Sequence, residues 1–371
     1  MKKITQLKNL KNKTVIVRVD FNVAMSKGKV LDDTKIRHSL QTINYLLKNK
    51  AKVILLSHLG RPENKVVKSL SLEPIAKHFS TLIKHKVDFV KTIEQAKVSQ
   101  SDLILLENIR FFPREHLNCK RWAKQLASLG DYYVFEAFAS YRQESSVNAI
   151  ADYLPSYAGF RFLAEVANLK GITTKKPGSI LILGGAKAET KIKIIKNLLK
   201  QYDYILLGGV LANTFLKAFD FEIGKSVYEP KSISACKKLI SAKILLPIDV
   251  VVKTKSGRKI KPVNEVEKGD YIYDLGPETL EYYKEIIKSA KQIVFNGPMG
   301  YYEQLAWQRG SNEIALAIAA SKAKKVAGGG ETVDLINDLN IAQHFSFIST
   351  GGGAMLKYLE DGKLPIFDKL K

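Results

Sequence analysis

Hydrophobic residues in this chain fall into short runs that alternate with longer stretches of helical spacing. In the first half, runs rich in valine, isoleucine and leucine predict strands at 14–19, 52–56, 103–106 and 132–135. Amphipathic stretches between these runs predict helices at 36–48, 72–84 and 115–129. Short strands that alternate with helices are typical of βαβ units and of a parallel sheet flanked by helices, which places the chain in the α/β class.

The second half repeats this rhythm. Predicted strands lie at 179–183, 204–207, 243–246, 292–295, 325–327 and 345–348, and predicted helices include 191–199 and 279–289. A turn-rich segment at 154–159, a helical stretch and a second Gly/Pro-rich segment at 171–178 separate the halves. We therefore predict an N-terminal lobe at 1–155, a bridging hinge helix within 156–175 and a C-terminal lobe at 176–355. The Gly/Lys-rich segment 253–261 is predicted to be a surface hairpin or loop.

Composition adds one unusual feature, the net charge. The 59 lysines and arginines exceed the 36 aspartates and glutamates by 23, and only ten of the basic residues are arginines. A field of this sign attracts phosphates, nucleic acid or acidic metabolites, although solvated lysine-rich helix faces would also produce it. The two cysteines are too few for a disulfide framework and indicate a reducing cytosol. No apolar run reaches about 18 residues, so no membrane partner is expected.

Charged and polar residues follow the predicted strands of the first half, which is where open parallel sheets bind ligands. The segments are Arg18-Val-Asp-Phe-Asn22, Ser57-His-Leu-Gly-Arg-Pro62, Glu107-Asn-Ile-Arg-Phe111 and Tyr141-Arg142. The arginines of these segments would converge on one crevice, together with histidine, aspartate and asparagine side chains. Arginine forks bind carboxylate and phosphate, whereas Asp and Asn suit hydroxyl groups. This pattern predicts a site for a small, highly anionic, hydroxylated metabolite.

Glycines follow the predicted strands of the second half. They occur in GGAK (184–187), GG (208–209), NGPMG (296–300), GGGET (328–332) and GGG (351–353). A strand that leads through glycines into a helix presents backbone N–H groups and the positive helix end to phosphate. Five such loops, with Lys187 and Lys191 beside the first, predict a nucleotide with several phosphates, and Glu331 or Asp334 could hold Mg²⁺ through them. Neither the P-loop nor the dinucleotide-binding glycine pattern is present.

Taken in order, these segments resemble phosphoglycerate kinase. The match is carried by RVDFNV (18–23), SHLGRP (57–62), ENIRF (107–111), GGAK (184–187), NGPMG (296–300), GGG (328–330) and STGGGA (349–354), and it runs from about residue 5 to the C-terminus. The resemblance implies reversible phosphoryl transfer between 1,3-bisphosphoglycerate and ADP, giving 3-phosphoglycerate and ATP with Mg²⁺. It also implies two similar-sized Rossmann-like lobes that close about a hinge in a cytoplasmic monomer, with a tail at 356–371 that returns to the N-terminal lobe.

The resemblance also implies roles for single residues. The substrate set is Asp20, Phe21, Asn22, Lys35, His58, Leu59, Gly60, Arg61, Arg110 and Arg142. The nucleotide set is Lys187, Lys191, Gly208, Gly209, Glu303, Gly329, Gly330, Glu331 and Thr332, with Glu331 as the metal ligand and Glu303 on the ribose. The catalytic set is Lys35, Lys187 and Gly352, which would contact the phosphoryl group in transfer. This suits the chemistry, because phosphoryl transfer needs alignment and charge neutralisation more than proton shuttling.

Several positions depart from the family's pattern. Glu331 stands for an aspartate, Val210 and Ile272 stand for glycines near the nucleobase, and Tyr141 stands for a histidine in a segment one residue shorter. Lys35 stands where the family carries its catalytic arginine, and a lysine keeps the charge but loses the planar fork. We therefore expect an active but slowed enzyme.

Two other functions remain open from the sequence. The chain could be a family member that binds its ligands without efficient transfer. It could also be a nucleic-acid-associated protein that uses its positive charge, but it shows no basic stripe with interleaved aromatic residues and no known reader module. We accordingly predict no nucleic-acid partner.

Overall fold

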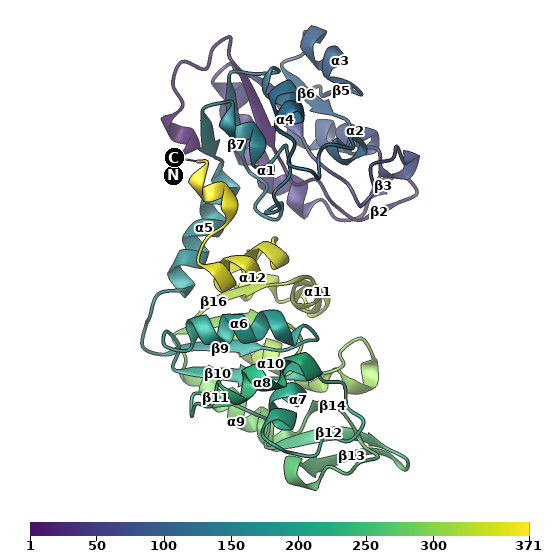
Figure 1. Ribbon diagram of the computed structural model, residues 1–371, viewed down its shortest axis with the longest axis vertical. Helices are drawn as coiled ribbons and strands as arrows, with labels where there is room; N and C mark the ends of the chain where they lie inside the picture. Colours follow the sequence, from purple (N-terminus) through teal and green to yellow (C-terminus); the bar gives the residue numbers. More distant parts are fainter. Residues whose placement is uncertain (371) are drawn as a thin grey trace. The chain divides into compact units, whose positions relative to one another are not determined.

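The computed structural model describes residues 1–370, which form two compact units (Figure 1). Unit 1 comprises Met1–Ala167 and the C-terminal segment from Lys363 onward, and unit 2 comprises Asn168–Gly362. Helix α5 (Phe160–Ile172) begins in unit 1 and ends in unit 2. Each unit contains a six-stranded parallel sheet with helical crossovers, which confirms the predicted α/β class.

The sheet of unit 1 has the strand order β5-β6-β4-β1-β7-β8. Its strands are β1 (Thr14–Arg18), β4 (Lys52–Leu56), β5 (Asp88–Val90), β6 (Leu103–Leu106), β7 (Tyr132–Phe135) and β8 (Ser156–Ala158). The helices that connect them are α1 (Thr34–Lys48), α2 (Glu73–Ile83), α3 (Ile93–Val98) and α4 (Lys120–Ala127). A two-stranded ribbon, β2 (Met25–Ser26) and β3 (Lys29–Val30), precedes α1. The central strands are buried on both faces because a parallel sheet is covered by helices on both sides.

The C-terminal segment packs onto unit 1. The backbone N–H of Lys2 donates to the carbonyl of Leu370 at 2.7 Å, and the ring of Phe367, in the 3-10 helix Pro365–Asp368, packs edge-on against Phe162. Both ends of the described chain therefore contribute to the same unit.

The sheet of unit 2 has the order β11-β10-β9-β15-β16-β17. Its strands are β9 (Ser179–Leu183), β10 (Tyr204–Leu207), β11 (Ile244–Leu245), β15 (Gln292–Asn296), β16 (Lys324–Gly328) and β17 (Phe347–Ser349). Its helices are α6 (Ala188–Leu198), α7 (Gly209–Ala218), α8 (Ile233–Lys237), α9 (Pro277–Ser289), α10 (Arg309–Ala320), α11 (Gly330–Asp338) and α12 (Gly352–Asp361). Helices α6 and α12 pack against each other (Figure 1).

A second, antiparallel sheet extends unit 2. It has the order β13-β12-β14, formed by β12 (Asp249–Thr254), β13 (Gly257–Pro262) and β14 (Tyr271–Leu275). The hairpin predicted at 253–261 is confirmed as the β12–β13 turn, but strand β14 was not predicted from the sequence. Strand β14 has the sequence YIYDL, so it lacks the continuous aliphatic run by which the strands of the parallel sheets were found.

All ten strands predicted from hydrophobic runs are present, and one helix prediction is wrong in part. The helix predicted at 115–129 begins only at Lys120. Its first residue, Glu115, is instead buried, and its carboxylate accepts hydrogen bonds from the hydroxyl of Ser146 at 2.5 Å and from Trp122 Nε1 at 3.3 Å. The bond to Ser146, 31 residues away, accompanies turns at residues 113–118, so a tertiary contact overrides helical spacing there. Within residues 1–370, no helix is both long and apolar enough to cross a membrane.

Candidate active site

His58 is the centre of a cationic cluster in unit 1. It follows β4, is 6% exposed, and its Nδ1 lies 3.1 Å from Arg18 Nη2. Because a guanidinium can only donate, Nδ1 is the acceptor and the ring proton resides on Nε2. The pKa of His58 lies well below its ordinary value, first because of burial and then because of the surrounding charges of Arg18, Arg110, Lys35 and Arg142. His58 is therefore a neutral hydrogen-bond donor among four cations.

The loop after β1 brings Asp20, Asn22 and Lys35 together. Lys35 Nζ lies 3.2 Å from Asp20 Oδ2, and it donates to the carbonyl of Asn22 at 3.2 Å. The side-chain oxygen of Asn22 accepts the backbone N–H of Gly60 at 2.9 Å, so this loop is tied to the loop after β4. Lys35 lies in the first turn of α1 and remains partly exposed, which leaves its ammonium group accessible to an anion.

Arg37, two residues further along α1, faces a different partner. Its Nε and Nη2 donate to the two carboxylate oxygens of Asp33 at 2.6 and 2.9 Å, and its side chain is 56% exposed. Residues two apart on a helix do not share a face. Arg37 is therefore held away from the Lys35–Asp20 pair.

The remaining substrate-set residues divide into exposed and buried groups. The side chains of Arg61 and Arg142 are exposed, whereas Arg110 is 6% exposed. Phe21 packs its ring 5.1 Å from that of Phe79, and Leu59 is also buried in the core of unit 1. Phe21 and Leu59 can thus offer a ligand only their backbone.

In unit 2, the loops after β9 and β15 touch through their backbones. A Cβ on Gly184 would lie 1.9 Å from the carbonyl oxygen of Pro298, so only glycine fits there. The N–H of Gly185 donates to the same carbonyl at 2.7 Å. Lys191 of α6 lies under these loops with its Nζ donating to the carbonyl of Gly184, and burial lowers the pKa of Lys191 to about 8. Lys187, the N-cap of α6, is exposed.

Two further helix starts meet at the ends of β16 and β17. Gly329, the N-cap of α11, has φ +108°, a conformation that favours glycine. A Cβ on Gly352, the first residue of α12, would lie 2.8 Å from the Cα of Gly329, so the two helix starts are in backbone contact. The hydroxyl of Thr332 accepts the N–H of Gly297 at 2.7 Å and thus supports the loop after β15. Helix N-termini placed in this way are suited to phosphate.

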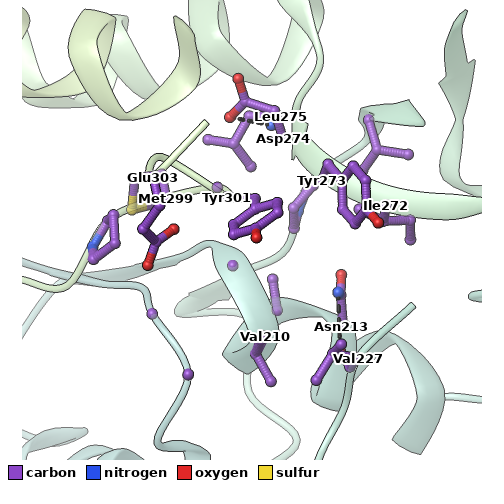
Figure 2. A pocket seen from close by; sticks show the side chains of 18 of the residues that line it. Val210, Asn213, Val227, Ile272, Tyr273, Asp274, Leu275, Met299, Tyr301 and Glu303 are labelled. Atoms are coloured by element: carbon purple, nitrogen blue, oxygen red, sulfur yellow. Dashed lines mark hydrogen bonds between the residues drawn. The ribbon is translucent and has the colours of Figure 1, made fainter. Parts of the chain in front are cut away.

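A largely apolar cavity of about 440 Å³ lies beside these loops. Val210 and Ile272 line it, together with Tyr273, Tyr301 and Glu303. Figure 2 shows the ring of Tyr301 in the middle of the cavity, with Glu303 on one side and Tyr273 on the other. The rings of Tyr273 and Tyr301 are 5.4 Å apart, which is a favourable aromatic distance. A cavity of this size and lining is typical of a small-molecule site.

Asp274 also lines this cavity. Its carboxylate accepts the N–H groups of Leu275 and Gly310 at 2.9 and 2.8 Å, and burial raises the pKa of Asp274 to about 7. A Cβ on either Gly300 or Gly310 would lie within 2.3 Å of this carboxylate. Asp274 therefore joins the end of β14 to the start of α10, and the loop after β15 passes close to its carboxylate at Gly300.

The family model for phosphoglycerate kinase matches residues 4–363 of the chain. This chain belongs to the phosphoglycerate kinase family. A phosphoglycerate kinase of Moorella thermoacetica is 41% identical over 375 residues, covering 96% of this chain and 95% of that protein. One from Herpetosiphon aurantiacus is 41% identical over 373 residues, covering 95% of each.

Solved structures of the phosphoglycerate kinase family have the same fold. The structure of phosphoglycerate kinase from Coxiella burnetii superposes with a TM-score of 0.89 at 35% identity, covering 99% of this chain and 98% of that one. The phosphoglycerate kinase of Pyrococcus horikoshii superposes with a TM-score of 0.85 at 32% identity, covering 100% and 98%. The resemblance to this family, and the two-lobe α/β fold that it implies, are thereby confirmed.

The family motifs gather as two sets, one in each unit. In unit 1 the contacts join Asp20, Asn22, Lys35 and Gly60, and the charges of Arg110 and Arg142 act on His58. In unit 2, the cavity lining contains Gly209, Glu303 and Glu331 from the nucleotide set. Whether each residue performs its assigned role stays a prediction.

Some residues of these sites were missed by the motif analysis. In unit 1, no sequence motif indicated a role for Glu144, which contacts Arg110, or for Ser146, which accepts from Arg18 Nε at 2.9 Å. In unit 2, the aromatic cavity residues Tyr273 and Tyr301 were also missed. Glu144 follows Arg142 by two positions, and this acidic residue beside a proposed phosphate ligand was the one available signal.

Proposed function

We propose that this member of the phosphoglycerate kinase family catalyses reversible phosphoryl transfer between 1,3-bisphosphoglycerate and ADP, giving 3-phosphoglycerate and ATP. The observation that carries the proposal is the set of four cations around neutral His58 in unit 1. A small anion with both a carboxylate and a phosphate matches this set. The family membership supplies the reaction class, a phosphotransferase with ATP or ADP as co-substrate.

In this proposal, unit 1 binds the phosphoglycerate. Asp20 and Asn22 would hold the hydroxyl and carboxyl region of the substrate. The phosphate would be bound by residues that include His58 as an Nε2–H donor, Arg61, Arg110 and Arg142. A carboxylate oxygen of 3-phosphoglycerate then attacks the γ-phosphorus of ATP, and the bond from that phosphorus to the bridging oxygen of ADP breaks. The attacking carboxylate carries no proton, so the reaction needs no general base, which suits a histidine held neutral.

Unit 2 would bind the nucleotide. Its base would enter the cavity lined by Val210 and Ile272, and Glu303 would contact the ribose. The loop and helix-start residues Gly208, Gly209, Gly329 and Gly330 would meet the phosphates, together with Lys187 and Lys191. During transfer, Lys35, Lys187 and the α12 N-terminus at Gly352 would offset the charge on the phosphoryl oxygens.

The donor set of the cavity fits Mg²⁺. The exposed carboxylate of Glu331 lines the cavity beside Gly185 of the first glycine loop. Mg²⁺ is commonly held by one or two carboxylates and by phosphate oxygens, so Glu331 with a nucleotide would suffice. When bound, the ion would neutralise part of the phosphate charge.

The proposal also covers the predicted hinge, the oligomeric state of the protein and its location in the cell. We infer lobes at 1–155 and 176–355 with a hinge at 156–175, because α5 continues from unit 1 into unit 2. We also infer a cytoplasmic monomer, and the two free thiols, Cys119 and Cys236, suit a reducing compartment.

A coupled assay tests the proposed function. Production of 1,3-bisphosphoglycerate from 3-phosphoglycerate and MgATP would be followed by its reduction with NADH and glyceraldehyde-3-phosphate dehydrogenase. We expect turnover that requires both substrates and Mg²⁺. Absence of turnover with intact 3-phosphoglycerate binding would instead indicate a member that binds without transfer. Salt-dependent DNA binding at physiological ionic strength would favour the nucleic-acid function.

A further inference from the structure

A buried carboxylate lies inside the cationic cluster of unit 1. The side chain of Glu144 is 3% exposed, and its Oε1 accepts from Arg110 Nη2 at 2.8 Å. The same oxygen lies 3.3 Å from His116 Nδ1, and Oε2 lies 4.0 Å from Arg18 Nη2. An anion at this place needs a physical reason, because it competes with an anionic ligand for the same cations.

Arg110 is held by two separate anchors. Its Nη1 donates to the carbonyl of Gly60 at 3.0 Å, while its Nη2 donates to Glu144. Two bonds to different nitrogens of a planar guanidinium fix both its position and its plane. Gly60 belongs to the loop after β4 and Glu144 to the segment after β7, so the two anchors come from different loops.

The charges explain why one anchor is a carboxylate. Burial, together with Arg18 and Arg142, lowers the pKa of Arg110, and the charge of Glu144 acts in the opposite direction. Two buried guanidinium groups with no intervening anion would repel each other at low dielectric. Glu144 approaches both Arg18 and Arg110, so its negative charge offsets the repulsion between these two buried guanidinium groups.

We propose that Glu144 is a positioning residue for Arg110 and, at the same time, a built-in counter-anion that weakens the binding of phosphate to unit 1. The carboxylate fixes the guanidinium in the orientation that receives the substrate phosphate, and its charge offsets part of the positive field at that point. The inference rests on the assignment of Arg110 to the substrate phosphate in the proposed function.

Two substitutions separate the effect of the charge of Glu144 from the effect of its side-chain length. Glu144→Gln keeps a side-chain oxygen that can accept from Arg110 but removes the charge. We expect the KM for 3-phosphoglycerate to fall about threefold or more, with kcat within about twofold. Glu144→Asp keeps the charge but is one methylene shorter, so Arg110 loses its anchor and KM should rise about threefold or more.

Glu115→Gln is the matched control. Glu115 is also a buried carboxyl group of this region, but it accepts hydrogen bonds from Ser146 and Trp122 rather than from Arg110. Burial raises the pKa of Glu115 to about 7, so the variants are compared at pH 8, where most of this group is ionised. This control should leave KM within about twofold, because the effect of Glu144 requires direct contact with Arg110. A fall in KM as large as that of Glu144→Gln would mean that any buried negative charge in the region acts alike, and it would overturn the positioning role.

A binding measurement keeps the inference separate from the proposed function. Inorganic phosphate is titrated against the melting temperature of the full chain, and the concentration for half-maximal stabilisation is compared among the variants. Glu144→Gln should need about threefold less phosphate than the unmodified chain, whether or not the protein turns over 3-phosphoglycerate. An unchanged or higher requirement overturns the inference while leaving the proposed function intact. If Glu144→Gln does not fold, Glu144→Asp decides, because an unchanged or lower phosphate requirement there contradicts the positioning role.

Discussion

The two units form their anion sites in different ways, one from charged side chains and the other from backbone. Unit 1 uses charged side chains that are held by other side chains, as in the contacts of Arg18 with His58 and of Arg110 with Glu144. Unit 2 uses backbone, because Gly184 and Pro298 pack so closely that no side chain fits between them, and Gly352 packs in the same way on Gly329. A side-chain site depends on which charge stands at a position, whereas a backbone site depends on the absence of a side chain.

This contrast follows from what each unit is proposed to bind. The phosphoglycerate is small and strongly charged, so several cations must converge on few atoms. A nucleotide has a large uncharged part, and unit 2 offers it an apolar cavity beside helix N-termini. Changes of side-chain chemistry should therefore damage unit 1 most, and changes of backbone space should damage unit 2 most.

The largest effect is expected at Lys35. Lys35→Ala should lower kcat by about 100-fold or more and change KM much less, because the cation acts mainly on the transferring phosphoryl group. Lys35→Arg should raise kcat above that of the unmodified chain, since a planar fork can bind two phosphoryl oxygens. Steady-state kinetics in the coupled assay measure both.

Arg37→Ala is the control for Lys35. Because Arg37 is paired with Asp33 on another face of α1, its loss should leave kcat within about twofold. If Lys35→Ala left kcat unchanged, Lys35 would take no part in the reaction. The proposal that a charged side chain of unit 1 acts on the transferring phosphoryl group would then be wrong.

Gly184→Ala tests the backbone description of unit 2. The added Cβ would lie 1.9 Å from the carbonyl oxygen of Pro298, so the free energy of unfolding should fall by about 2–4 kcal/mol. Gly330→Ala is the matched control, because a Cβ there meets no atom within 4 Å. Denaturant unfolding of both variants measures the difference. Equal stability of the two variants would show that the loops after β9 and β15 can move apart without lowering the free energy of unfolding.

A buried carboxyl group at a helix start is common to both units, as Glu136 in unit 1 and Asp274 in unit 2. Glu136 accepts hydrogen bonds from Thr42 Oγ1 at 2.6 Å and from the N–H of Arg161 at the start of α5 at 3.0 Å. Burial raises the pKa of Glu136 from 4.5 to about 7, and the hydrogen bonds offset only part of this shift. The folded chain therefore holds the Glu136 proton more tightly than the unfolded chain does.

This shift predicts a pH dependence of stability. A raised pKa in the folded state means that the stability contribution of Glu136 is complete below pH 4.5 and is lost as the pH rises through about 7. Glu136→Gln cannot ionise, so between pH 5 and pH 8 its unfolding free energy should gain about 2 kcal/mol relative to the unmodified chain. Denaturant unfolding at both pH values measures this gain. A difference that does not change with pH would mean that Glu136 is ionised in the fold at pH 5.

The smallest effect is expected in the choice of nucleobase. Val210 and Ile272 line the cavity with hydrocarbon, and the side-chain amide of Asn213 already donates to the carbonyl of Val227 at 3.1 Å. A pocket that reads the base mainly by shape and stacking discriminates weakly between purines. The KM values for ATP and GTP should therefore differ by less than about tenfold. A hundredfold preference for ATP would show base-specific hydrogen bonding.

Much of the fold was predictable because the parallel strands are buried on both faces. Such strands appear as continuous hydrophobic runs, and each one predicted is present. The exposed strand β13 and the short strands β5 and β8 lack that signal. Glu115 was included in a predicted helix for a related reason, since only the folded chain brings Ser146 and Trp122 to its carboxylate.

The sequence by itself determined the class of chemistry, because arginines and glycines directly after buried strands must gather at one edge of a parallel sheet. Tertiary structure alone decided how those residues are used. It turned Arg18 inward to hold His58, paired Arg37 with Asp33 and placed Glu144 against Arg110. These partners come from separate loops or different turns, and their ionisation depends on burial. The order of residues along the chain shows neither which side chains meet nor how deeply they are buried.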